Sequence, residues 1–171
     1  KDQEEYIAYG GSPRTAGYWN YVTEELVLYD AEKQGGKAKN RDEKTFVVLY
    51  HEAFHQYIFY SCGEVSPHSW FNEGYGDYFG GADIKGGKVK SIGLNPMRAW
   101  VVKALAEGDT LYYRGFQQIK GLESFEKMIR LPKSVYYSDI RGYPTGWSMI
   151  YFLNSKQAQK RKDWAAILDR K

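Results

Sequence analysis

The chain is short of the features that would place it in several large classes of protein. It has one cysteine in 171 residues, so it can form neither an internal disulfide nor a zinc site built from Cys-x-x-Cys pairs. No apolar run approaches the length of about 18 residues that a membrane-spanning helix requires. The formal net charge is only +3, which gives no reason to expect nucleic-acid binding. We therefore expect a globular protein with no membrane span and no nucleic-acid partner.

Histidine is also scarce, with three in the chain, the last at position 68. Tyrosine is abundant, with 16 residues. The length fits a single domain over residues 1–171 that can bury a core. The chain begins at Lys1 and not at methionine, so we expect a processed product or an excised piece, with any signal peptide or anchor lying outside it.

Apolar periodicity and turn-forming residues predict an α+β fold, a small antiparallel sheet followed by helices. Capping by Asn40 and Glu43 should start the longest helix, and apolar residues on nearly every side predict that this helix is buried. The expected strands lie at 6–9, 18–19, 26–29 and 88–92, with loops at 31–39 and 82–87. The expected helices lie at 40–61, 69–79, 96–107, 122–130, 143–154 and 161–169.

His51, Glu52 and His55 form a His-Glu-x-x-His pattern on the longest predicted helix. Residues four apart project from one face of a helix, so the two imidazoles should lie one turn apart. This spacing is typical of zinc binding, with the glutamate acting on water at the metal. Glu73 and Asp77 are also four apart, on the next predicted helix. One of these carboxylates would bind zinc while the other accepts the ring N–H of a liganding histidine.

Three other features have simpler interpretations. His68 is a rival third ligand, but its Pro-His-Ser context favours a loop before the second helix. Cys62, beside a predicted helix end, should be a partly buried thiol without a role. The Lys/Arg cluster at 156–162 and 170–171 should be a solvated helix face and not a patch that binds nucleic acid or a membrane.

The motif at 51–55 followed by Asn-Glu-x-x-x-Asp at 72–77 resembles that of the thermolysin-like gluzincin metallopeptidases. Further stretches, at 17–30, at 70–74 and from Tyr143 onward, are similar to the bacterial peptidase-MA-like domains of that group. The resemblance implies a zincin-like fold, with the zinc site formed by the His-Glu-x-x-His helix and the antiparallel helix that carries the glutamate. It also implies a secreted, periplasmic or cell-envelope location outside the cytoplasm.

By this resemblance, three residues would bind Zn²⁺: His51, His55 and Glu73. Glu52 would be the base that activates the zinc-bound water, while Asn72 and Asp77 would support the ligands, with Asp77 orienting His51. The donor that stabilises the oxyanion would be a tyrosine or histidine after the third ligand. No histidine follows position 68, and Tyr143 is our choice among the tyrosines, with Tyr136 and Tyr137 in reserve. The strand formed by Leu26, Val27 and Leu28 would carry an extended peptide.

These observations together predict a zinc-dependent peptide-bond hydrolase acting on a peptide or protein substrate. The metzincin class is excluded, because Ile58 and Ser61 stand where that motif needs glycine and a third histidine. The Gly-x-Met-Glu-Asn stretch of gluzincin aminopeptidases is missing, so endopeptidase-like action is expected. The alternative is a zinc-stabilised but catalytically silent cell-envelope or peptide-binding module. The presence of Glu52, which zinc retention does not require, favours the enzyme.

Overall fold

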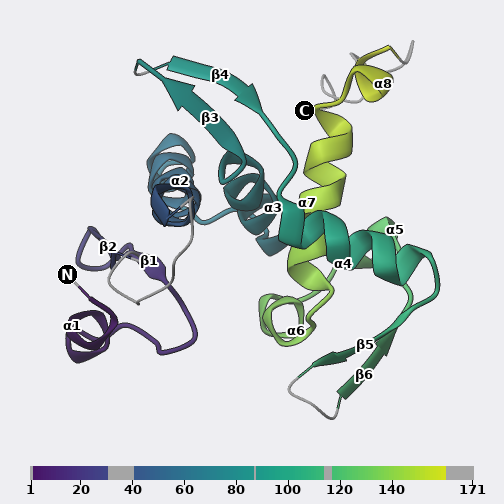
Figure 1. Cartoon of the computed structure of the whole chain (residues 1–171), viewed down its shortest axis with the longest axis horizontal. Coiled ribbons are helices and arrows are strands. Elements are labelled where there is room, and N and C mark those ends of the chain that lie inside the picture. The colour runs from purple at the N-terminus through teal and green to yellow at the C-terminus, as the bar shows by residue number, and fades with distance from the viewer. Residues whose placement is uncertain (1, 31–40, 87, 114–116, 161–171) are drawn as a thin grey trace. The chain divides into compact units, whose positions relative to one another are not determined.

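The computed structural model describes residues 2–30, 41–86, 88–113 and 117–160. It divides into two compact units. One contains the residues up to His68 together with Tyr75–Asn95, and the other contains Ser69–Gly74 together with the residues from Pro96 onward. The division falls inside one helix, α3 (Ser69–Phe79). The described residues contain both helices and two-stranded antiparallel sheets, which confirms the predicted α+β class (Figure 1).

Besides the end of α3, the described part of the first unit contains two helices and four strands in two hairpins. These elements are α1 (Gln3–Ala8), β1 (Gly17–Asn20), β2 (Glu25–Leu28), α2 (Arg41–Ser61), β3 (Ala82–Lys85) and β4 (Lys88–Ile92).

Helix α1 stands where a strand was predicted at residues 6–9, so that prediction was wrong. The Asp2 side chain accepts a hydrogen bond from the Glu5 N–H at 2.9 Å, and the Glu5 carboxylate accepts one from the Asp2 N–H at 3.0 Å. This capping box satisfies two backbone donors at the start of the helix. The ring of Tyr6, 2% exposed, packs against the ring of Tyr18 in β1. Capping and this packing outweigh the strand propensity of the aromatic residues.

The predicted hairpin is confirmed as β1 paired antiparallel with β2. At the turn, the Asn20 side chain accepts a hydrogen bond from the Val22 N–H at 2.9 Å, which stabilises the reversal of the chain. Both strands pack on α2. A Cβ added at Gly17 would lie 2.7 Å from the Val48 side chain, so the glycine permits the close approach of strand and helix.

Helix α2 is followed by Gly63 with a left-handed φ of +71°, in agreement with the predicted helix end. The predicted burial on every side was wrong. Phe54 and Phe59 are buried, but Phe46 is 48% exposed and Tyr57 is 66% exposed. The reason is that two-stranded hairpins cover only part of the circumference of the helix. The caps predicted at residues 40 and 43 lie outside the described residues and side chains.

The elements around α3 differ from prediction in one detail. Helix α3 covers the predicted range, with His68 at the N-cap position and no side chain capping it. The segment 82–87, predicted as a loop, contains strand β3, which pairs with the correctly predicted β4. Ile84 faces Val89 across the pair, and Gly86 turns the chain with φ +60°. This cross-strand pair stabilises the hairpin. The local sequence pattern does not indicate it, because its two residues belong to different strands.

Besides the start of α3, the second unit is mainly helical and is built around α7. Its elements are α4 (Pro96–Ala106), β5 (Thr110–Tyr113), β6 (Gln117–Lys120), α5 (Phe125–Met128), α6 (Lys133–Ser138), α7 (Gly142–Leu153) and α8 (Lys156–Gln159). Helices α4, α5, α6 and α8 all contact α7 (Figure 1). The two buried clusters consist of Met128, Leu131, Tyr136 and Met149, and of Val101, Leu105 and Ile119.

Helices α4 and α7 confirm two predictions, and Gly108 with φ +90° follows α4 as expected. The helix predicted at 122–130 is shorter than expected and consists of α5 alone. It begins later because the Ser124 side chain caps its N-terminus. The hairpin β5–β6 and helix α6 were not predicted, since each is only four to six residues long. The helix predicted at 161–169 lies outside the described residues. Within the described residues, no helix combines the length and the apolar character needed to cross a membrane.

Candidate metal centre

Three side chains on α2 bring metal-binding atoms together. One ligand atom each from His51, Glu52 and His55 lies within 4.8 Å of the other two, so this group could hold a metal ion. The rings of His51 and His55 are 4.6 Å apart between centroids and nearly perpendicular, at 86°. The arrangement follows from the four-residue spacing on one regular helix.

Asp77, from the last turns of α3, lies against the first histidine. Its Oδ1 atom is 3.3 Å from the Nδ1 atom of His51, and Asp77 is 4% exposed. A carboxylate at Nδ1 favours the tautomer that carries its proton there, and Nε2 is then the nitrogen that could bind a metal ion. Both residues belong to the first unit.

Gly76 lets the backbone of α3 approach the same imidazole. A Cβ added at this position would lie 2.9 Å from the Cε1 and Nδ1 atoms of His51, closer than real Cβ contacts allow. The imidazole therefore packs directly on a helix backbone and is fixed by it. This role of Gly76 was not predicted, although the two glycines in Glu-Gly-Tyr-Gly-Asp are unusual within a helix.

Glu52 contacts strand β1. Its Oε2 atom accepts a hydrogen bond from the backbone N–H of Trp19 at 3.0 Å. The hydrogen bond from the Tyr29 N–H to the Ala16 carbonyl makes these two residues a hydrogen-bonded pair of the antiparallel ladder. Hydrogen-bonded and non-hydrogen-bonded pairs alternate along such a ladder, so Gly17 and Trp19 belong to non-hydrogen-bonded pairs. Their backbone groups therefore point away from β2, along the outer edge of β1. The strand whose backbone meets Glu52 is thus β1, whereas the sequence indicated 26–28 as the strand beside the site.

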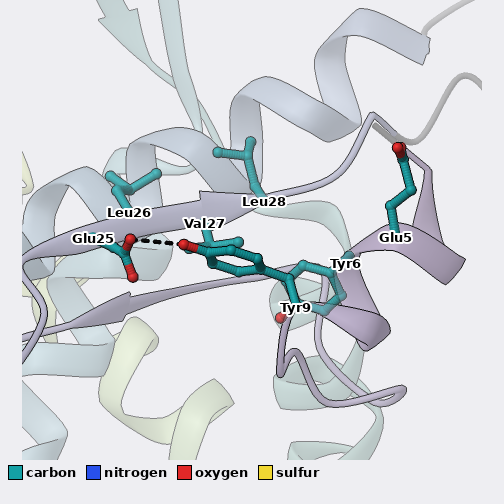
Figure 2. Close-up of a pocket in the computed structure, with 7 residues that line it drawn as sticks. All are labelled: Glu5, Tyr6, Tyr9, Glu25, Leu26, Val27 and Leu28. Carbon is teal, nitrogen blue, oxygen red and sulfur yellow. Dashed lines mark hydrogen bonds between the residues drawn. The ribbon is translucent and has the colours of Figure 1, made fainter.

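Strand β2, which includes the predicted peptide-binding residues Leu26, Val27 and Leu28, borders a pocket of about 330 Å³. Glu5 and Tyr6 of α1 and Tyr9, which follows the helix, line the same pocket (Figure 2). The Tyr9 hydroxyl donates to Glu25 Oε1 at 2.7 Å. This hydrogen bond lowers the pKa of the Glu25 carboxyl and raises the pKa of the Tyr9 phenol. Figure 2 shows Leu26 and Leu28 directed to the side of β2 opposite Tyr9.

Glu73 belongs to the second unit, in the first turns of α3. It is 5% exposed, and its Oε1 atom accepts a hydrogen bond from the Tyr137 hydroxyl at 2.6 Å. The adjacent Gly74 packs on α7, since a Cβ there would lie 2.7 Å from the Gly146 carbonyl oxygen. Neither contact was predicted from the sequence. Asn72, the other predicted supporting residue on α3, is half-buried.

The three candidate tyrosines have different surroundings. The Tyr136 side chain is fully buried in the core of the second unit. Tyr143 packs against that core, and the Arg98 guanidinium lies 5.0 Å from the centre of its ring. Tyr137 is 41% exposed, and its hydroxyl donates a hydrogen bond to Glu73.

Two further predictions concerned residues near the site. His68 is exposed at the N-cap of α3. Cys62 is an exposed free thiol, so the expectation of partial burial was wrong. It lies beyond the end of α2, where the chain turns at Gly63 and nothing covers the side chain.

The residues fit a bound metal ion in three respects. Imidazole and carboxylate atoms converge on one face of α2. One imidazole has a buried carboxylate beside its Nδ1 atom, the usual support of a metal-binding histidine. The same ring is fixed from a second side by Gly76, so its orientation does not depend on a flexible neighbour.

No family model matches the chain, and no curated protein and no solved structure shows significant similarity to it. The likeness of two short motifs to gluzincins is therefore not accompanied by a match over the whole chain. The case for a function rests on the residues of this chain and on their contacts.

Proposed function

We propose that the protein is a zinc-dependent peptide-bond hydrolase with endopeptidase-like action. The observation that carries the proposal is the group of His51, Glu52 and His55 on one face of α2, with the Asp77 carboxylate 3.3 Å from the His51 ring. Two imidazoles one helical turn apart suit the preference of zinc for nitrogen ligands. The carboxylate between them in the sequence suits a general base.

The proposed zinc ligands are His51, His55 and Glu73. Support for Glu73 comes from the Asn-Glu-x-x-x-Asp motif at 72–77, in which it precedes Asp77 by four residues. Three protein ligands are typical of a catalytic zinc site, in which the remaining position is used by water or substrate.

In this proposal zinc, when bound, supplies a Lewis acid that lowers the pKa of water and polarises a peptide carbonyl. Glu52 would accept a proton from the attacking water and deliver it to the leaving amine. The Trp19 N–H would hold Oε2 of Glu52 and so aim the carboxylate. The Tyr143 hydroxyl would donate a hydrogen bond to the carbonyl oxygen as negative charge develops there.

The substrate would be a peptide in extended conformation that pairs with the β1–β2 hairpin as an additional strand. The outer edge of β1 is the better candidate, because the backbone of Trp19 on that edge already touches Glu52. The outer edge of β2, with Leu26 and Leu28, is the second candidate, supported by the pocket that it borders.

Digestion of a broad peptide library by the wild type and by Glu52→Gln, both loaded with zinc, tests this function. We expect wild type to cut internal peptide bonds and the variant to be at least about 100-fold slower, because it lacks the base. Elemental analysis should find the same zinc content in both. Glu107→Gln, which changes an exposed glutamate on the second unit, is the matched control and should cleave like wild type.

The competing candidate is the silent zinc-stabilised module, and the same experiment separates the two. Equal, background-level cleavage by wild type and Glu52→Gln, with zinc retained, would favour the module. A wild-type protein that binds no zinc would rule out both.

A further inference from the structure

Within the second unit, the Tyr137 hydroxyl donates a hydrogen bond to the Glu73 carboxylate. The hydroxyl oxygen lies 2.6 Å from Oε1, a distance typical of a hydroxyl that donates to a carboxylate. Glu73 is 5% exposed, so little water competes for this oxygen. The contact joins residues far apart in the chain, one from α3 and one from α6.

Packing holds both partners in place. The ring of Tyr137 lies 5.6 Å from that of Tyr136 and 6.0 Å from that of Tyr143, both edge-to-face. The backbone next to Glu73 is fixed as well, because Gly74 meets the backbone of Gly146 in α7 without room for a side chain. Since both ends are fixed, the hydroxyl defines the rotamer of the carboxylate.

A carboxylate that binds zinc through one oxygen gains from a donor on the other. The donor fixes the orientation of the group before the metal arrives, so less conformational entropy is lost on binding. Partners of this kind typically contribute 10- to 100-fold in metal affinity.

We propose that Tyr137 is a positioning residue that orients Glu73 for metal binding, a role separate from that of an oxyanion donor. The inference rests on the proposed function, since it takes Glu73 as the third zinc ligand. It assigns different roles to two neighbouring tyrosines. Tyr137 determines how tightly zinc is held, and Tyr143 acts on the substrate carbonyl.

Zinc affinity, measured by competition with a chromophoric chelator, tests the inference on the full chain. Tyr137→Phe keeps the ring and removes only the hydroxyl, and the affinity should fall about 10- to 100-fold. Tyr143→Phe makes the same change in a ring of the same cluster and should leave the affinity within about twofold, while kcat at saturating zinc falls. Circular dichroism spectra of both variants should match that of wild type.

A double-mutant cycle shows whether Tyr137 acts through Glu73. In a Glu73→Ala background, which itself binds zinc more weakly, the change Tyr137→Phe should cause no further loss. The inference is overturned if Tyr137→Phe binds zinc as tightly as wild type, or if its loss persists in full in the Glu73→Ala background. Failure of the proposed function is a different result, in which the wild-type chain itself binds no zinc.

Discussion

The α-carbon of Gly76 faces the imidazole of His51 so closely that a Cβ added there would lie 2.9 Å from two ring atoms. Helix α3 therefore contributes to the site through its backbone as well as through the Asp77 carboxylate. Any side chain at position 76 must push the imidazole away from its present orientation. This relationship gives the first prediction.

Gly76→Ala should weaken zinc binding by at least about tenfold, because the added methyl group displaces the His51 ring from the Asp77 carboxylate. Alanine in a helix is otherwise stabilising relative to glycine, by about 0.5–1 kcal/mol, so a loss of affinity cannot be assigned to a weaker helix. Chelator competition measures the effect. Gly93→Ala is the control, since its Cβ would meet only an ordinary contact at 3.7 Å. An unchanged affinity in Gly76→Ala would contradict the prediction.

Asp77→Asn should reduce zinc affinity about 10- to 100-fold, because an amide is a weaker acceptor for the His51 ring N–H than a carboxylate. The change is nearly isosteric, so the packing of α3 on α2 should survive. Asp83→Asn, which alters an exposed aspartate beside Lys85 in the same unit, serves as the comparison and should bind zinc like wild type. Equal affinities of the two variants would show that Asp77 does not orient a metal ligand.

Gly74→Ala should destabilise the protein by about 1–3 kcal/mol, because the new methyl group would be forced against the backbone of Gly146 in α7. A carbonyl oxygen at 2.7 Å cannot rotate away as a side-chain atom can. Urea denaturation followed by circular dichroism measures the free energy of unfolding. Gly93→Ala again provides the control. A Gly74→Ala variant as stable as wild type would mean that α3 and α7 can separate at no cost.

Elements with strong local signals were predictable from the sequence, and elements held by tertiary contacts were not. Helix α4 has proline at its start and glycine after its end, so its limits are encoded locally. Strand β3 has no such signal and depends on Ile84 facing Val89 in the next strand. Helix α1 was misjudged because its capping box involves Asp2 and Glu5, ahead of the aromatic residues that indicated a strand.

The same distinction holds for the site. The grouping of His51, Glu52 and His55 depends only on helical spacing, which the sequence contains. The contact of Glu52 with the Trp19 N–H involves a backbone group, and no residue type signals it. Which of several tyrosines contacts Glu73 depends on how α6 packs, and α6 itself was not predicted.

A final prediction concerns the dependence of stability on pH in the second unit. Burial alone would raise the pKa of the Asp139 carboxyl, but its hydrogen bonds to Arg141 and the charge of that residue hold the pKa below its usual value. The Arg141 guanidinium donates to both carboxylate oxygens, at 2.9 Å from Nε to Oδ1 and 2.7 Å from Nη2 to Oδ2.

A pKa that is lower in the folded than in the unfolded state stabilises the protein above the unfolded value, which is about 3.9 for aspartate. This contribution is lost as the pH falls through the folded pKa. Asp139→Asn should therefore lower the free energy of unfolding by about 1–2 kcal/mol at pH 7. Its difference from wild type should shrink steadily below about pH 4. Urea denaturation across this range measures both effects, with the exposed Asp109→Asn as control. A difference that is as large at pH 3 as at pH 7 would show that the lost stability does not come from the ionised carboxylate.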